Sequence, residues 1–288
     1  MNSRDMSSNR RMGVVKHGTG FLVMAYILLC ASLIIVAFPL LTMVMSSLKE
    51  TRQIFKQPFA LPVPPQWQNY AMAWERASFS IYMRNSLIVT TVSIILILLV
   101  SVMAAYPLSR YSFRGRRLLT FVFLVGLMLP MRLGIVKLYL IMRDLDLIDK
   151  LWSLIFTYVA MRIPFSIFIL TGFMQTIPDS YEEAARIDGC TEFQLLWQVV
   201  VPLVKPALGI VTLFSAIAIW NDFFFPFVFI YDDALKTLPV GLGTFFGQFQ
   251  VNWGLLFAGL TIASVPMLLL YALAAKDFVK GLAVGGLK

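Results

Sequence analysis

Long, uninterrupted runs of apolar residues restrict the fold of this chain more than any other feature of its sequence. The first run extends from about Gly20 to Leu48, and a helix needs about 20 apolar residues to cross a bilayer. Of 288 residues, 59% are hydrophobic and 14% are charged, whereas an ordinary soluble domain has about a quarter charged residues. The sequence therefore predicts an all-α, polytopic membrane protein.

Six such runs predict about six transmembrane helices, which places both termini on the same side of the membrane. If the N-terminus is cytoplasmic, the inner segments carry 12 Lys and Arg and the outer segments 8, a bias that favours cytoplasmic termini. The predicted spans are 20–48, 85–108, 118–139, 151–175, 203–231 and 255–275. The predicted divisions are a cytoplasmic tail 1–19, a first helix 20–48, an outer loop 49–84, a core 85–275 and a cytoplasmic tail 276–288.

The net charge of +9 does not indicate a nucleic-acid partner, because the basic residues are spread among loops between apolar runs. We assign them to topology and to contact with anionic lipid of the bilayer. Cys30 lies in an apolar run and Cys190 in a polar loop, so no disulfide is expected. With His17 as the single histidine, neither a metal site nor a catalytic triad is predicted.

The segment 178–202 is a polar, acidic loop between two predicted spans. Ser180 and Glu183 have the spacing of a capping box that begins a helix, and Gly189 is placed to end it. The residues Thr191 and Gln194 repeat the capping spacing, before Pro202 ends the next helix. The sequence thus predicts two short helices joined by a glycine turn on the cytoplasmic face.

This loop has the properties of a docking element for a basic partner. Ala184 and Ala185 allow close approach of another backbone, Arg186 and the flanking acids offer charge pairs, and Phe193 offers apolar surface. The alternative is a solvated amphipathic loop whose caps are incidental.

The same segment resembles the EAA signature of ABC importer permeases. Glu183-Ala184-Ala185, Gly189 and the stretch 199–202 have the spacing of that signature, with valine at 199 for isoleucine and at 201 for leucine. The resemblance implies a coupling helix that sits in a groove of an ATPase subunit. It implies ATPase coupling by Glu182, Glu183, Ala184, Ala185, Arg186, Asp188, Gly189, Phe193 and Pro202.

Other stretches are similar to the second permease of maltose-type importers. They include 47–49, 104–110, Trp220-Asn221-Asp222-Phe223 and 278–282. The resemblance implies a location in the bacterial inner membrane, a second permease subunit, an ABC ATPase dimer and an extracytoplasmic sugar-binding protein. It also implies that this chain holds no cofactor and that the ATPase subunits bind ATP and Mg.

Ionisable residues inside the spans are candidates for the substrate path, because a charge among lipid tails is costly. One interpretation is a polar path that offers hydrogen bonds and aromatic faces to a sugar. Its candidate residues are Tyr158, Arg162, Trp220, Asn221 and Asp222. The other interpretation is an internal ion pair of Arg162 with Asp222, together with snorkelling by Arg132 and Lys137.

No GxxxxGK[ST] loop is present, so ATP hydrolysis is expected from another chain, and this chain is predicted not to be an enzyme. The fragment Gly241-x-Gly243-x-x-x-Gly247 departs from the spacing of a dinucleotide-binding motif. Two rival functions remain. One is an ABC importer for another solute, such as glycerol phosphate, amino acids or peptides. The other is a standalone transporter or channel, which would need no ATPase.

Overall fold

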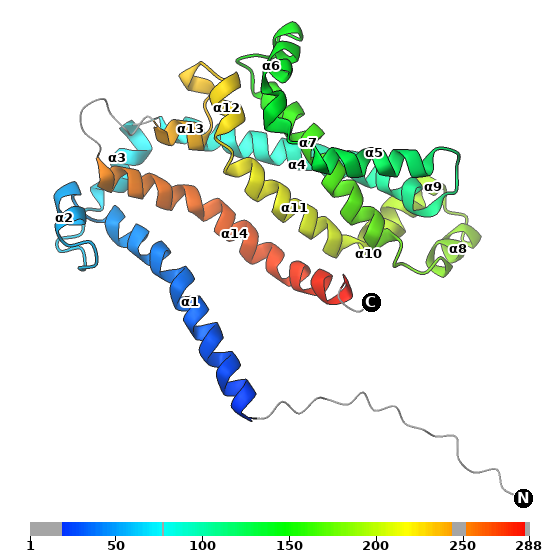
Figure 1. The fold of residues 1–288 in the computed structure, drawn as a ribbon, viewed down its shortest axis with the longest axis horizontal. Coiled ribbons are helices and arrows are strands. Elements are labelled where there is room, and N and C mark those ends of the chain that lie inside the picture. Colours follow the sequence, from blue (N-terminus) through cyan, green and yellow to red (C-terminus); the bar gives the residue numbers. More distant parts are fainter. Residues whose placement is uncertain (1–18, 77, 244–251, 286–288) are drawn as a thin grey trace, which may run out of the picture.

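The computed structural model describes residues 19–76, 78–243 and 252–285, and these residues form helices joined by short connections (Figure 1). The predicted tail 1–19 lies outside the described residues except for Thr19, and so does Gly247 of the glycine-rich fragment. Gly247 therefore cannot be placed relative to Gly241 and Gly243.

Four single helices are long and apolar enough to cross a membrane. They are α1 (Thr19–Ser47), α4 (Phe79–Arg110), α7 (Leu151–Met174) and α14 (Trp253–Gly285). Two bent pairs supply the remaining crossings, so the prediction of about six spans in an all-α protein is confirmed. α14 continues ten residues beyond the predicted end of the last span at 275 and includes most of the predicted C-terminal tail.

The predicted span 118–139 is bent instead of forming one continuous helix. The chain forms α5 (Arg116–Met128), a short 3-10 turn η1 (Met131–Gly134) and α6 (Ile135–Asp144), and the two arms meet at an angle of 81°. Pro130 precedes the turn, and proline has no N–H with which to continue the helical hydrogen bonds. α6 therefore projects away from α5 (Figure 1).

The predicted span 203–231 is also interrupted. α11 (Lys205–Trp220) ends before Asn221, and a separate short helix, α12 (Phe224–Phe229), follows. At 1.5 Å per residue, a helix of α11's length covers about 24 Å, less than the hydrocarbon thickness of about 30 Å. α11 alone is consequently too short to cross the hydrocarbon layer as a straight helix before the break after Trp220.

The bundle packs around α4 and α7, which contact each other along their lengths, while α11 contacts α4, α7 and α14. Buried Leu154, Leu170, Leu195, Val211 and Phe229 belong to this core. Among the spans, α1 packs mainly against α14 and leaves most of its apolar side chains exposed. Helices α2, α3 and α13 lie at one end of the spans and α8 at the other (Figure 1).

The predicted outer loop 49–84 contains two short helices, α2 (Thr51–Lys56) and α3 (Gln68–Arg76). α4 begins at Phe79, inside the predicted loop. Asn69 donates hydrogen bonds from Nδ2 to the carbonyl oxygens of Ser47 and Lys49, at 2.8 and 3.2 Å. These bonds tie α3 to the end of α1.

The start of α14 fits closely against this junction at Gly254. A Cβ atom there would lie 2.8 Å from Asn69 Nδ2 and still closer to the carbonyl oxygen of Lys49. We therefore expect Gly254→Ala to lower the free energy of unfolding by about 1–3 kcal/mol, the usual cost of overpacking. Thermal unfolding in detergent measures this change. Gly172→Ala in α7 is the control, because a Cβ there meets nothing within 4 Å; equal midpoints for the two variants would contradict the expected clash.

Candidate functional site: the bracket and the polar cavity

The first short helix of the predicted loop is α8 (Ser180–Ile187). The predicted capping box is not formed: the residue before the helix is Asp179, which caps nothing with its side chain. The predicted glycine turn is confirmed, since Gly189 has φ +83°. The N–H groups of Gly189 and Cys190 donate to the carbonyls of Arg186 and Ala185, at 3.1 and 3.0 Å, which is the Schellman arrangement.

The second short helix begins with the predicted capping box. Thr191 N–H donates to Gln194 Oε1 at 2.9 Å, and Gln194 N–H donates to Thr191 Oγ1 at 3.3 Å. α9 (Glu192–Gln194), a π-helical segment η2 (Leu195–Val200) and α10 (Val201–Leu203) follow without a break. Pro202 does not end this helix as predicted; the axis turns by 75° after Leu203, at the start of α11. Residues 178–202 therefore form two short helices, which we call the bracket.

The inner face of α8 is attached to the C-terminal end of α4. Glu182 is 3% exposed and forms an ion pair with Nε of Arg110. Tyr106 Oη donates to Glu182 Oε2 at 3.2 Å. Arg110 also donates to Asp179 Oδ1 at 2.9 Å and to the carbonyl of Ile177 at 3.1 Å. A buried carboxylate is thus paired across two elements that are far apart in the sequence.

Glu192 joins the two helices of the bracket to each other and to α4. Its carboxylate accepts hydrogen bonds from Tyr111 Oη at 2.6 Å, Arg186 Nε at 2.8 Å and Tyr106 Oη at 3.2 Å. The hydrogen bond from the Arg186 guanidinium has the largest effect on the pKa of Glu192 and the bond from the Tyr111 hydroxyl the next largest. Together they lower this pKa to about 2. Glu192 therefore stays ionised at physiological pH.

The outer face of α8 carries apolar side chains that are exposed in the described chain. Ile187 is 87% exposed and Tyr181 is 53% exposed, and Phe193 of α9 is 68% exposed. Sequence reasoning missed Tyr181 and Ile187 as coupling candidates. The spacing of Ala184 and Ile187, three residues apart on one helical face, is the signal that could have found Ile187.

The predicted coupling residues consequently separate into two groups. Glu182 and Ala185 are buried against the permease body, and Arg186 is held by Glu182 and Glu192. The outward group consists of Glu183, Ala184, Asp188, Gly189, Phe193 and Pro202.

Four of the five predicted substrate-path residues line the same cavity, and Trp220 does not. Arg132, Tyr158, Arg162, Asn221 and Asp222 line one cavity of about 620 Å³ between α7, η1 and the break after α11. Its volume lies in the range of small-molecule sites, about 300–1,000 Å³. We call it the polar cavity.

Asp222 is 8% exposed and organises one wall of the polar cavity. Tyr158 Oη and Phe225 N–H donate to its Oδ2 at 2.9 and 3.1 Å. The predicted ion pair with Arg162 is not formed; Arg132 Nη2 lies 3.5 Å from Oδ1 of Asp222 instead. The Arg132 guanidinium also lies over the Phe224 ring, 5.5 Å from its centroid. Arg132 therefore contacts both Asp222 and Phe224, which the interpretation of Arg132 as a snorkelling side chain did not include.

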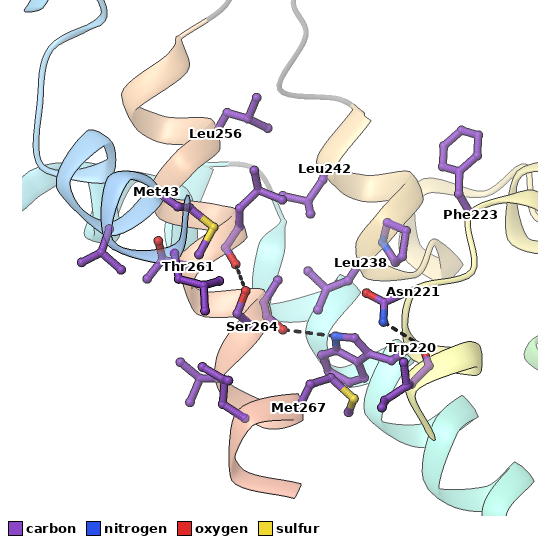
Figure 2. Close-up of a pocket in the computed structure, with 18 of the residues that line it drawn as sticks. Met43, Trp220, Asn221, Phe223, Leu238, Leu242, Leu256, Thr261, Ser264 and Met267 are labelled. Atoms are coloured by element: carbon purple, nitrogen blue, oxygen red, sulfur yellow. Dashed lines mark hydrogen bonds between the residues drawn. The ribbon is translucent and has the colours of Figure 1, made fainter. Parts of the chain in front are cut away.

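Trp220 lies elsewhere. It lines an apolar cavity of about 760 Å³ between α1, α11, α13 (Leu238–Leu242) and α14 (Figure 2). Its Nε1–H donates to the carbonyl of Ala263 at 3.1 Å, and the residue is 4% exposed. The indole therefore joins α11 to α14 and does not face the polar cavity. Phe223, which sequence reasoning did not select, lines both cavities and stacks on Phe227, with ring centroids 5.1 Å apart.

Comparisons with known proteins agree with this architecture. Residues 97–280 match the family described as binding-protein-dependent transport system inner membrane component. The chain is 39% identical to a probable ABC transporter permease protein, YurM, of Bacillus subtilis, over 91% of this chain and 87% of that one. It is 36% identical to the diacetylchitobiose uptake system permease protein NgcG of Streptomyces coelicolor, over 92% and 85% of the two chains.

Among solved structures, a chain from a bacterial ABC transporter involved in the import of the acidic polysaccharide alginate matches with a TM-score of 0.77. The match has 26% sequence identity and covers 90% of this chain and 96% of that one. The bent spans, the bracket and these matches lead to one conclusion. The chain belongs to the family of binding-protein-dependent transport system inner-membrane components and is a multi-pass permease subunit of an ABC importer.

Proposed function

We propose that this chain forms one side of a translocation pathway for a sugar or oligosaccharide and that the bracket receives the motion of an ATPase. A partner ATPase dimer binds ATP and Mg and hydrolyses the nucleotide, and an extracytoplasmic binding protein delivers the cargo. The relatives named above include an uptake system for diacetylchitobiose, and another, 32% identical, is a melibiose/raffinose/stachyose import permease of Bacillus subtilis. These names support a saccharide cargo.

The observation that carries the coupling role is the division of α8 into two faces. Its inner face holds the buried Glu182 against Arg110, while Ile187 and Tyr181 on the other face are largely exposed. An element that is rigidly joined to the permease on one side and apolar at its exposed tip is suited to an interface core. A push on the outer face would reach α4 through the Arg110–Glu182 pair.

The exposed apolar face of α5 supports the presence of a second permease subunit. α5 buries none of its residues in this chain, and its apolar side chains are exposed along the helix. Within a membrane, such a face contacts lipid or another helix. We propose that a second permease covers part of it. We also propose that both termini of the chain are cytoplasmic, on the side of the bracket.

Co-purification tests the docking role of the bracket. The tagged chain is expressed in its native cell and purified in mild detergent, and the proteins that accompany it are identified by mass. We expect an ATPase and a second permease with the native chain. Ile187→Asp places a charge in an interface core, so we expect at least a tenfold loss of ATPase, equivalent to about 1.4 kcal/mol. Glu183→Ala is expected to weaken ATPase recovery less.

The matched control for this experiment is Leu61→Asp. Leu61 is 75% exposed and lies in the segment between α2 and α3, at the opposite end of the spans from α8. Its ATPase recovery should equal that of the native chain. A chain that emerges alone, under conditions that preserve other importers, would overturn the proposal in favour of a standalone transporter or channel.

A further inference from the structure

The polar cavity contains more positive than negative charge. Arg132 and Arg162 both line it, against the single carboxylate of Asp222. Arg132 uses its guanidinium on Asp222 and on the Phe224 ring. One guanidinium, that of Arg162, therefore remains to be neutralised.

Among the residues that the structure describes, no group lies within hydrogen-bond or ion-pair distance of the Arg162 guanidinium, and the Asp222 carboxylate attracts it only from farther away. The backbone carbonyl of Arg162 accepts a bond from Ser166. The side chain is half-buried. It lies eleven residues from the start of α7 at Leu151, a depth of about 16 Å at 1.5 Å per residue. A guanidinium at this depth is costly unless a charged or polar group meets it.

We propose that the polar cavity binds an oxyanion on the saccharide cargo, a carboxylate or a phosphate, and that Arg162 is the residue that contacts it. The guanidinium presents its donors in a planar fork that matches both kinds of oxyanion. Asp222 is already occupied by Tyr158, Phe225 and Arg132. Asp222 therefore fixes the position of the cavity wall, and the donors of the Arg162 guanidinium remain available to bind the cargo.

The rest of the cavity suits the sugar ring that carries this group. Asn221 is exposed and donates its Nδ2–H to the Ile217 carbonyl at 2.8 Å, which leaves Oδ1 to accept from a hydroxyl. The exposed Phe223 ring offers an apolar face beside it. This arrangement of a few polar groups with an aromatic wall is typical of small-molecule sites.

The test rests on the proposed function and uses the complete importer in proteoliposomes with its binding protein. Two matched pairs of disaccharides keep the linkage and differ only in their charged groups: α-1,4-galactobiose with digalacturonate, which carries a carboxylate on each ring, and maltose with maltose 6′-phosphate. ATP-driven uptake gives KM and kcat for each probe, and the affinity of the binding protein alone is measured separately for each. The pairs distinguish a carboxylate cargo from a phosphate cargo.

We expect uptake of at least one charged disaccharide in preference to its neutral partner. Arg162→Gln should raise KM for the charged probe about 10- to 100-fold, the range for loss of a charge-assisted contact. KM for any neutral probe that is imported should stay within about twofold of the native value. Arg162→Lys keeps the charge without the fork and should fall between. Lys137→Gln is the matched control, since Lys137 is an exposed cation of α6 outside the cavity, and it should change neither value.

Three results would count against us, and they are distinguishable. Uptake of neutral disaccharides alone overturns the oxyanion assignment and leaves the importer function intact. An Arg162→Gln variant that loses its partner subunits on gel filtration, or that affects all probes equally, assigns Arg162 to a carboxylate of the second permease. Uptake of none of the four probes, by a complex that hydrolyses ATP, contradicts a saccharide cargo itself.

Discussion

Replacing Arg110 by methionine is expected to separate the bracket from α4 and to abolish ATP-driven uptake. The substitution removes the closer of two cationic partners from the Glu182 carboxylate, which is 3% exposed, and leaves only Arg186 Nη2 at 3.5 Å. Removing one partner of a buried pair typically costs about 3–5 kcal/mol, and the remaining contact of Glu182 with Arg186 places the expected loss at the lower end of this range. We therefore expect a lower unfolding midpoint in detergent together with loss of uptake in proteoliposomes.

A double variant distinguishes the pair from its surroundings. Arg110→Met combined with Glu182→Met removes both charges, so we expect it to recover much of the stability that Arg110→Met loses. Arg143→Met is the control. Its partner Asp144 is a neighbour on the surface, with side chains 60% and 66% exposed, and such pairs contribute about 0–1 kcal/mol. If Arg110→Met behaved like Arg143→Met, the attachment of α8 to α4 would not depend on this ion pair.

The features that sequence reasoning found are those whose causes are local. Hydrophobic runs predicted the spans α1, α4, α7 and α14 because length and composition suffice for a crossing helix. Gly189 predicted a turn, and Thr191 with Gln194 predicted a cap, because each signal acts within three or four residues. The Ser180 box failed although its spacing was correct, since Asp179 and Ser180 adopt helical backbone and leave no extended cap residue.

The features that it missed depend on residues far apart in the sequence. Glu182 and Glu183 are adjacent acids, yet only Glu182 is buried. Successive residues differ by about 100° around a helix, so only Glu182 lies on the face of α8 that packs against Arg110 of α4. Arg132, not Arg162, pairs with Asp222 because the chain bends by 81° near Pro130. The spacing of residues along the sequence predicts neither this bend nor the position of the Arg132 side chain beside Asp222.

Asp222 is the residue of the polar cavity whose loss is expected to cost most stability. Asp222→Ala would leave Tyr158 Oη and the Phe225 N–H without their acceptor, and Arg132 without its carboxylate. We expect a loss of about 2–6 kcal/mol, because two buried donors lose their acceptor at about 1–3 kcal/mol each, whereas the Arg132 side chain is 69% exposed and stays solvated. Tyr158→Phe removes a single hydrogen bond and should cost about 1 kcal/mol. Unfolding midpoints of the two variants measure this order, and equal losses would contradict the role of Asp222 as the organiser of the wall.

Asp222→Asn separates shape from charge at the same position. The amide oxygen still accepts from Tyr158 and Phe225, so the cavity wall should persist, while the negative charge opposite Arg162 disappears. If the cargo carries an oxyanion, the additional net positive charge should lower KM for the charged disaccharide and leave KM for its neutral partner unchanged. Arg162→Gln is expected to shift the same KM in the opposite direction. If the two variants shift KM in opposite directions for the charged disaccharide alone, the charge of the cargo must interact with residues of this cavity. If both variants shift KM in the same direction, they merely disturb the structure of the cavity.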